Sequence, residues 1–265
     1  MKLKIPFRKQ RNLVSVVRLS GMISSGARGQ INDETLAPVF KRAFSKGDPV
    51  AVALVVNSPG GSPVQSSLIG ARIRSLALEK NIPVYAFVED VAASGGYWLA
   101  AAADEIYVDK SSIVGSIGVI SAGFGAHELI NRYGIERRVY TAGKSKSTLD
   151  PFRPEKSEDI KRIKSLLEDV HQNFISYVYE RRGSLIGDGK DLFTGEFWIG
   201  QKAIELGLAD HIGHLEHVMK ERFGEKVRFK NYGPKKGLAH KLGINLFDST
   251  LALIEEKIAY GRFGL

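Results

Sequence analysis

Short runs of apolar, mostly β-branched residues alternate with amphipathic segments along most of the chain. The apolar runs predict strands over residues 13–19, 50–56, 84–88 and 105–108, and shorter ones over 117–121 and 137–141. Helical spacing of apolar residues predicts helices over residues 33–45, 63–78, 93–103, 127–132 and 155–182. This alternation is typical of an α/β domain with a mostly parallel sheet.

The end of the chain has a different pattern. A basic stretch over residues 226–243 precedes an apolar stripe, in which Phe247, Leu251, Ile254 and Ile258 recur at helical spacing. Such a stripe suits packing on the same chain, on a second subunit or on lipid. We therefore expect a basic tail over residues 1–12, one α/β domain over residues 13–225, and a basic linker with an amphipathic helix over residues 226–265.

The composition places the chain among globular proteins. Hydrophobic residues make up 43% and charged residues 25% of its 265 residues, which excludes disordered, collagenous and coiled-coil classes. The absence of cysteine excludes disulfides, thiolate metal sites and cysteine nucleophiles. No apolar run approaches the roughly 18 residues of a membrane span.

The formal charge of +9 is concentrated at the two ends of the sequence. Residues 1–12 and 226–243 contain basic residues and no acidic ones, while acidic and basic residues nearly balance elsewhere. A nucleic-acid enzyme would line its groove with this charge, so we expect no nucleic-acid partner. Basic ends on a nearly neutral body suit an anionic membrane surface, and solvated tails are the alternative.

Two glycine-rich turns each join a predicted strand to a predicted helix, where active sites of α/β sheets collect. In the first, residues 57–61, adjacent glycines let backbone N–H groups approach a negative oxygen. The second, residues 92–97, places Ser94 at the start of a helix. Its hydroxyl could serve there as a nucleophile or as an N-cap, and small neighbours would leave it accessible.

A serine nucleophile needs a base. His127 is the one histidine between Ser94 and the long helix, and nothing local orients it. The alternative is a lysine kept neutral by burial, for which Lys144 and Lys146 are candidates in a loop after a predicted strand. The spacing of these residues does not show whether Lys144 or Lys146 would be the base.

Other patterns that would imply a cofactor or a metal are absent or incomplete. The chain has no P-loop, no dinucleotide-binding glycine motif after a strand and no G-x-S-x-G elbow. His211, His214 and His217 are evenly spaced but lack the carboxylate of an H-E-x-x-H site. We expect surface histidines, no metal and no cofactor.

Further motifs follow the two turns in a fixed order. They are Gly115-Ser116-Ile117-Gly118-Val119, Gly143-x-x-Lys146-Ser147-x-x-x-Pro151-Phe152, Phe193-Thr194-Gly195 and Gly200-Gln201-x-Ala203-x-x-x-Gly207-Leu208-x-Asp210. Together with the turns, they resemble the signal peptide peptidase A family of serine peptidases, including its SohB branch, over about residues 13–215.

The resemblance implies a role for each matching residue. Ser94 matches the nucleophile and Lys146 the general base, while the N–H groups of Gly61 and Gly95 match the oxyanion hole. Ser147 would help to hold the lysine amine. The substrate groove would include Gly60, Gly96, Ser116, Ile117 and Gly118.

The resemblance also implies a fold and an assembly. The fold would be the α/β spiral of ββα units shared with Clp protease and crotonases. Members form rings, and in short members the serine and lysine of one site come from neighbouring subunits. One copy of the motifs therefore predicts a homo-oligomer acting on extended apolar peptides, such as remnant signal peptides or unfolded membrane-derived chains.

Members usually carry an N-terminal membrane anchor, whereas residues 1–12 are a short basic tail. We therefore expect a cytoplasmic protein that contacts the inner face of the membrane through its ends. A non-catalytic, membrane-associated scaffold of the same fold is one alternative function. A crotonase-like acyl-CoA enzyme is another, and Glu89 is the nearest acid before the serine turn.

Overall fold

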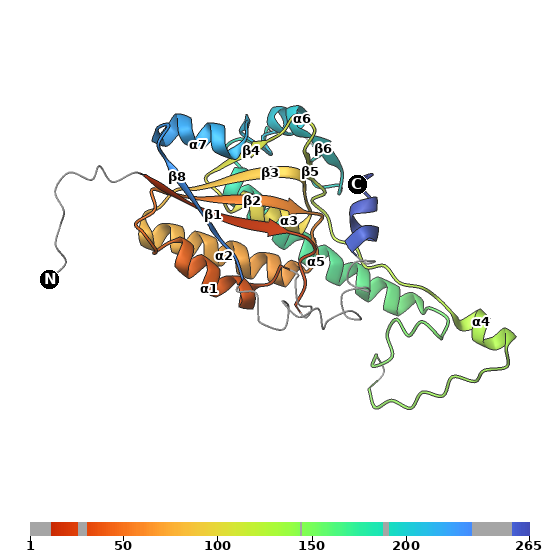
Figure 1. Ribbon diagram of the computed structural model, residues 1–265. Helices are drawn as coiled ribbons and strands as arrows, with labels where there is room; N and C mark the ends of the chain where they lie inside the picture. Colours follow the sequence, from red (N-terminus) through yellow and green to blue (C-terminus); the bar gives the residue numbers. More distant parts are fainter. Residues whose placement is uncertain (1–11, 26–30, 144, 188–190, 235–255) are drawn as a thin grey trace.

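The computed structural model describes residues 12–25, 31–143, 145–187, 191–234 and 256–265 (Figure 1). The strands are β1 (Leu13–Ser20), β2 (Ala51–Ser58), β3 (Val84–Ala93), β4 (Glu105–Val108), β5 (Ile113–Gly115), β6 (Phe197–Ile199), β7 (His211–Ile212) and β8 (Arg228–Tyr232). The helices are α1 (Asp33–Ala43), α2 (Pro63–Lys80), α3 (Gly95–Ala101), α4 (His127–Arg132), α5 (Ser157–Arg182), α6 (Gly200–Glu205) and α7 (Leu215–Phe223). A short C-terminal helix covers residues 256–261. Within the described residues, no helix has the length and apolar character needed to cross a membrane.

The strands form one sheet in the order β6-β5-β3-β2-β1-β8, and β4 and β7 continue it from the first half of β3. Every pairing is parallel except that of β5 with β6. Because β1, β2 and β3 run in the same direction, their carboxyl ends reach one edge of the sheet (Figure 1). The α/β architecture with a mostly parallel sheet is confirmed.

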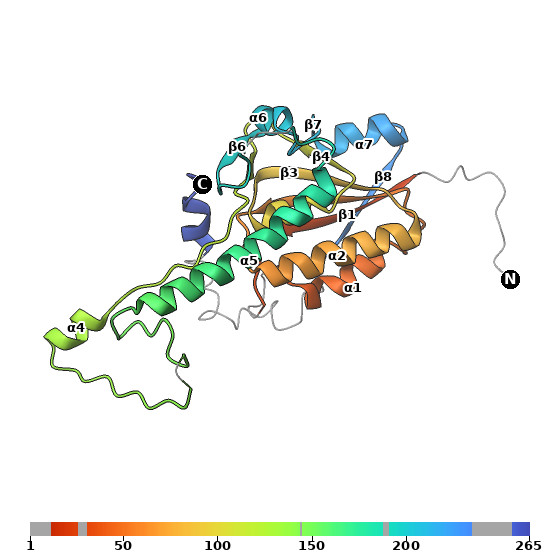
Figure 2. The same ribbon diagram turned by 180° about the vertical axis from the view of Figure 1, so that it is seen from behind.

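The central strand β2 is buried on both faces, as its unbroken apolar run predicts. One face contributes Val52, Leu54 and Val56 to a large core with α1, α2, α3 and α5. The other face contributes Ala51, Ala53 and Val55 to a smaller core covered by α7. Figure 2 shows α5 crossing the helical face and continuing beyond the edge of the sheet.

The segment after β5 departs from the sequence prediction. Gly115 and Ser116 have φ values of 112° and 52°, and the Ser116 amide donates to the Glu196 carbonyl, so the chain turns out of the sheet. The strand here is therefore β5, and the predicted strand over residues 117–121 is wrong. Residues 137–141 form no strand either, because no described strand pairs with them and all but the half-buried Val139 lie exposed.

From about residue 119 to residue 156 the chain forms an arm that projects from the body and carries α4 (Figures 1 and 2). Most of the arm is exposed. It includes large apolar side chains without a covering layer, among them Phe124, Tyr133 and Tyr140, which are 94%, 72% and 91% exposed. Apolar side chains gathered on one exposed segment are typical of a surface that contacts another protein.

The carboxyl-terminal region also differs from the expected linker and helix. Where the linker was predicted, residues 228–232 form β8 and pair with β1 in parallel. Phe229 and Tyr232 of β8 pack against the two cores on opposite faces of the sheet, and its exposed basic side chains are common on edge strands. Of the predicted apolar stripe, Phe247, Leu251 and Ile254 lie outside the described residues, and Ile258 is exposed.

Candidate active site

The two glycine-rich turns meet at the carboxyl edge of the sheet. β2 and β3 are neighbours, and Ser58 at the end of β2 is in register with Ala92 near the end of β3. A Cβ atom placed on Gly60 would lie 2.9 Å from each of the Ser94 Cβ, the Gly95 nitrogen and the Ala93 carbonyl oxygen. A residue with a side chain at position 60 would therefore separate the turns.

Ser94 occupies a strained backbone conformation. Its φ of 50° and ψ of −121° lie outside the regions that L-residues ordinarily adopt. The conformation is held by a hydrogen bond from the Ser94 amide to the Gly115 carbonyl (2.8 Å) and by one from the Trp98 amide to the Ser94 carbonyl (3.1 Å). The strain aims the side chain of a half-buried serine out of the strand-to-helix turn.

The Ser94 hydroxyl does not cap the helix that follows it. Ser94 stands at the N-cap position of α3, but its side chain makes no capping hydrogen bond. The N-cap interpretation of this serine is therefore wrong. Within the described residues its hydroxyl has no hydrogen-bond partner, which leaves it available to a ligand.

Two backbone N–H groups beside Ser94 are also uncommitted. In the described part of the chain, neither the Gly61 nor the Gly95 amide donates to an acceptor. A Cβ atom placed on Gly95 would lie 3.4 Å from the Gly61 nitrogen, so the two amides are neighbours. Gly61 has a φ of 144°, and a Cβ atom there would lie only 2.0 Å from the Ile23 carbonyl oxygen. Paired free amides next to a hydroxyl can stabilise a developing oxyanion.

Ser94 opens into a cavity of about 670 Å³. One wall consists of apolar residues from α3 and α5, namely Trp98, Val170 and Phe174. The Trp98 ring stacks on Phe174 with 4.9 Å between ring centroids, which fixes this wall. Glycine turns and residues from the carboxyl-terminal segment complete the lining.

Of the residues expected in the substrate groove, some line the cavity and others are buried behind it. Gly60, Ser116 and Gly118 line the cavity. Gly96 lies buried behind it, where a Cβ atom would approach the Ser58 carbonyl oxygen to 2.3 Å. Ile117 is also buried, and its carbonyl accepts a hydrogen bond from His171 Nε2 (3.2 Å).

Lys146 lies on the projecting arm, and Lys144 lies outside the described residues. Lys146 is exposed and is not among the residues that line the Ser94 cavity. Its neighbour Ser147 accepts a long hydrogen bond from Arg153 (3.5 Å). The chain by itself therefore does not bring Lys146 to Ser94. His127, the alternative base, begins α4 on the same arm.

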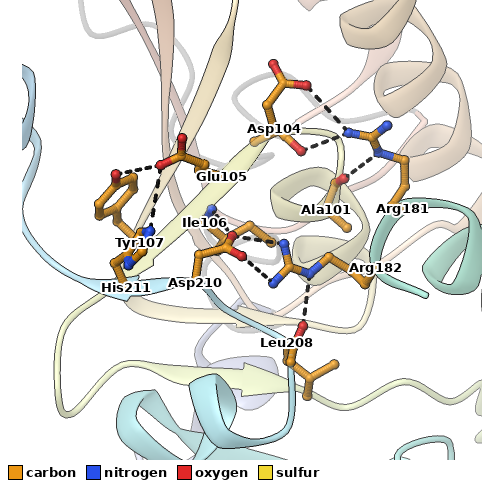
Figure 3. A network of polar contacts seen from close by, with 12 residues as sticks. Ala101, Asp104, Glu105, Ile106, Tyr107, Arg181, Arg182, Leu208, Asp210 and His211 are labelled. Atoms are coloured by element: carbon orange, nitrogen blue, oxygen red, sulfur yellow. Dashed lines mark hydrogen bonds and ion pairs between the residues drawn. The ribbon is translucent and has the colours of Figure 1, made fainter. Parts of the chain in front are cut away.

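A buried polar network holds the helices behind the nucleophile turn (Figure 3). Arg182, at the end of α5, donates to both carboxylate oxygens of Asp210 (2.9 and 3.0 Å) and to the Gly207 carbonyl. Asp210 also accepts from the Ile106 amide (2.7 Å). The network ties α5 to β4 and to the segment before β7, including Gly207 and Asp210 from the last motif of the sequence analysis.

Tyr97 connects this region to Ser94. It lies in the first turn of α3 and donates from its hydroxyl to the Leu208 carbonyl (2.9 Å). Complete burial raises the pKa of the Tyr97 hydroxyl, so it remains a neutral donor. The segment 207–210 therefore fixes the beginning of α3 and, with it, the turn that carries Ser94.

The other candidates from the sequence lie apart from this site. Glu89, the acid of the crotonase alternative, pairs with Arg18 beside a different cavity of about 450 Å³. His211 lies in β7 and His214 precedes α7, so they do not share a helical face with His217. The described residues contain no cluster of ligating side chains suited to a metal ion.

Sequence reasoning missed part of the cavity lining. Trp98 lies four residues after Ser94, and Val170 and Phe174 belong to the predicted apolar face of α5, so helical spacing was a usable signal. Met22 comes from the loop after β1, and Ala259 and Arg262 come from the carboxyl-terminal segment. No local pattern indicates that these last residues reach the site.

Comparison with known proteins gives the family. A family model described as peptidase family S49 matches residues 77–226, more than half of the chain. The chain belongs to peptidase family S49. This finding agrees with the resemblance to signal peptide peptidase A and SohB, since relatives with these names are among the similar proteins.

Among the relatives of this S49 chain, the probable protease SohB of Haemophilus influenzae is 30% identical and aligns with 93% of this chain and 68% of its own length. A Brucella abortus protein named Na(+)/H(+) antiporter NhaA is 46% identical, over 98% of this chain and 38% of its own length. The S49 chain thus spans about two fifths of that relative's length.

A solved structure supports the fold. It is a variant of the membrane-bound stomatin-specific protease 1510-N in complex with a substrate peptide, with a TM-score of 0.52 and 16% identity. The match covers 88% of the S49 chain and 96% of the other chain. The predicted α/β protease fold is confirmed, and so is the assignment to a peptidase family.

Proposed function

We propose that this chain is a serine endopeptidase in which Ser94 attacks the scissile carbonyl. The observation that carries the proposal is the uncommitted Ser94 hydroxyl, which a strained turn aims into a cavity beside the free Gly61 and Gly95 amides. Hydroxyl attack would place the negative charge of the tetrahedral intermediate on the former carbonyl oxygen. The two amides would stabilise that oxygen, and a single such donor is typically worth about 2.7–4 kcal/mol.

The general base in this proposal is Lys146, which accepts the Ser94 hydroxyl proton and returns it to the leaving amine. Because Lys146 lies on the projecting arm of its own chain, we infer that it serves the Ser94 of a neighbouring subunit in a homo-oligomeric ring. The exposed apolar side chains of the arm support this inference, since an inserted arm would bury them. Burial there would also favour the neutral amine that a base requires, with Ser147 as a neighbouring hydroxyl.

The proposed substrates are extended apolar peptides, such as remnant signal peptides or unfolded membrane-derived chains. An apolar wall of Trp98, Val170 and Phe174 supports this class, because it would receive an apolar side chain near the scissile bond. The proposed setting is the cytoplasmic side of a membrane, with the basic ends of the sequence in contact with anionic lipid.

Cleavage of an apolar fluorogenic peptide tests the proposal. The wild type should release the fluorophore, and Ser94→Ala should abolish the release while the elution volume of the protein stays the same. Ser75→Ala removes an exposed serine hydroxyl from α2 and should retain full activity. Equal activity in wild type and Ser94→Ala would overturn the assignment of the nucleophile. A well-formed oligomer without activity would favour the scaffold alternative.

A further inference from the structure

The carboxyl-terminal segment lies against the candidate active site. Its helix is placed beyond the carboxyl ends of the strands, next to β6, in both views of the molecule (Figures 1 and 2). Ala259 and Arg262 line the same cavity as Ser94. The segment is therefore part of the wall that a bound peptide would contact.

Contacts on either side of Arg262 hold it at this wall. The Tyr260 hydroxyl donates to the carbonyl of Asn57, the residue that begins the first glycine-rich turn (2.7 Å). Phe263 packs edge-on against Phe197 of β6, with 5.1 Å between the ring centroids. Because its neighbours in sequence are fixed to β2 and β6, Arg262 is held beside the cavity between these two contacts.

Arg262 differs in charge from the rest of the lining. The other described lining residues are glycines, prolines, apolar side chains, serines, one threonine and one histidine, so Arg262 is the single permanently charged residue among those that the structure describes. No carboxylate in the described part of the chain lies within ion-pair distance of its guanidinium. Its guanidinium carbon lies over the ring of Phe263, 6.0 Å from the ring centroid.

We propose that Arg262 is a specificity-determining residue that binds a carboxylate of the peptide substrate. The proposal rests on the proposed peptidase function and adds to it a charged subsite in a cavity whose other described lining residues carry no permanent charge. A guanidinium binds a carboxylate through parallel N–H donors and stays charged at every physiological pH. The carboxylate would come from the free end of a peptide or from an aspartate or glutamate side chain.

Peptide binding tests the proposal without requiring cleavage. The full chain with Ser94→Ala is titrated against an apolar peptide that carries an uncharged dye at its amino end. One form ends in a free carboxylate and one in an amide, and two further amidated forms contain an internal aspartate or asparagine. An exposed arginine–carboxylate contact typically strengthens binding about 1.5- to fivefold, so one of the charged forms should bind more tightly by that factor.

Substitutions on the carboxyl-terminal helix and its last turn test whether Arg262 causes the preference for the charged peptides. Arg262→Met should bring the charged-to-neutral affinity ratio to about one, since the cation is removed, and Arg262→Lys should keep part of it. Lys257→Met is the matched control, because Lys257 is exposed on the same helix and does not line the cavity. It should leave the ratio unchanged. The preference should also weaken as salt is raised.

One set of results would overturn the carboxylate subsite at Arg262, and a different result would overturn the proposed peptidase function. Equal affinity for charged and neutral forms in the parent, an unchanged ratio in Arg262→Met, or no binding of any form would overturn the carboxylate subsite. Cleavage is measured separately with Ser94 intact. A charge preference that depends on Arg262, in a protein that cleaves none of the peptides, would reject the peptidase and leave a peptide-binding site.

Discussion

Gly60 and Ser94 are packed so closely that a Cβ atom on Gly60 would lie 2.9 Å from the Cβ atom of Ser94. Gly60 also has a φ of 107°, which residues with a side chain rarely adopt. The turn that carries the Gly61 amide and the turn that carries the nucleophile therefore share one close contact. Their relative position depends on the absence of a single methyl group.

Gly60→Ala should both strain the protein and displace the nucleophile. We expect the free energy of unfolding to fall by about 1–3 kcal/mol, because a positive φ must be held against a side chain. We expect kcat/KM for the apolar peptide to fall at least tenfold, on the order of what small misplacements of reacting groups cause. Urea unfolding and peptide cleavage measure the two effects.

Gly123→Ala is the matched control, because a Cβ atom at Gly123 would meet nothing within 4 Å and its φ is not positive. It should change neither stability nor cleavage. A fully active Gly60→Ala protein would contradict the close apposition of the two turns.

The free Ser94 hydroxyl predicts an unusual result for stability. A serine that caps a helix typically contributes about 1 kcal/mol, but the Ser94 side chain makes no capping bond. Ser94→Ala should therefore change the free energy of unfolding by less than about 0.5 kcal/mol, the range of substitutions that break no specific interaction. Ser62 caps α2 by accepting a hydrogen bond from the Gln65 amide, so Ser62→Ala should cost more. A larger loss in Ser94→Ala than in Ser62→Ala would restore the capping interpretation.

Two buried tyrosines, Tyr97 and Tyr177, should respond differently when the hydroxyl is removed. Tyr97→Phe removes the hydrogen bond to the Leu208 carbonyl and should lower the free energy of unfolding by about 1 kcal/mol. The buried Tyr177 hydroxyl has no partner among the described residues, so Tyr177→Phe should be neutral or stabilising. Thermal unfolding at neutral pH distinguishes these signs.

Tyr97 and Tyr177 also make the stability of the protein depend on pH. Burial raises the pKa of both hydroxyls above the unfolded value near 10. Since the unfolded chain then loses these protons first, stability is fully present below about pH 10 and falls as the pH rises further. Either Phe variant should reduce this alkaline fall. An unchanged alkaline slope in both variants would contradict the raised pKa values.

Mixing two inactive variants tests whether neighbouring subunits share one site. Ser94→Ala lacks the nucleophile and Lys146→Ala lacks the base, so each alone should be inactive. In a mixed ring, roughly a quarter of the sites would receive both intact residues if subunits assemble at random. Recovery of that share of activity after dissociation and reassembly would support the arm exchange. No recovery from rings shown to be mixed would place both residues within one chain.

Much of the fold was predictable because burial imposes a clear pattern. The unbroken apolar run of β2 and the apolar face of α5 identified the core elements, and the alternation of strands and helices placed residues 57–61 and 92–97 in strand-to-helix turns, where active sites collect. The sequence could not decide between nucleophile and cap for Ser94, since that choice depends on its backbone torsion angles.

Other errors have equally local causes. Residues 117–121 are apolar enough for a strand, but positive φ values at Gly115 and Ser116 turn the chain first. Residues 137–141 have the composition of a strand, but no strand in the described part of the chain pairs with them. Arg262 is held at the cavity by tertiary contacts of Tyr260 and Phe263, which no local periodicity in the sequence indicates.

The pairing of β8 with β1 has a consequence for biosynthesis. β1 ends at Ser20 and its outer neighbour β8 begins only at Arg228, so a long stretch of chain must be synthesised between the two paired strands. Until then β1 exposes unpaired backbone groups along an apolar strand, which can attach to other nascent chains. We therefore expect a chain truncated before β8 to aggregate, and chaperone demand to persist until β8 has been synthesised.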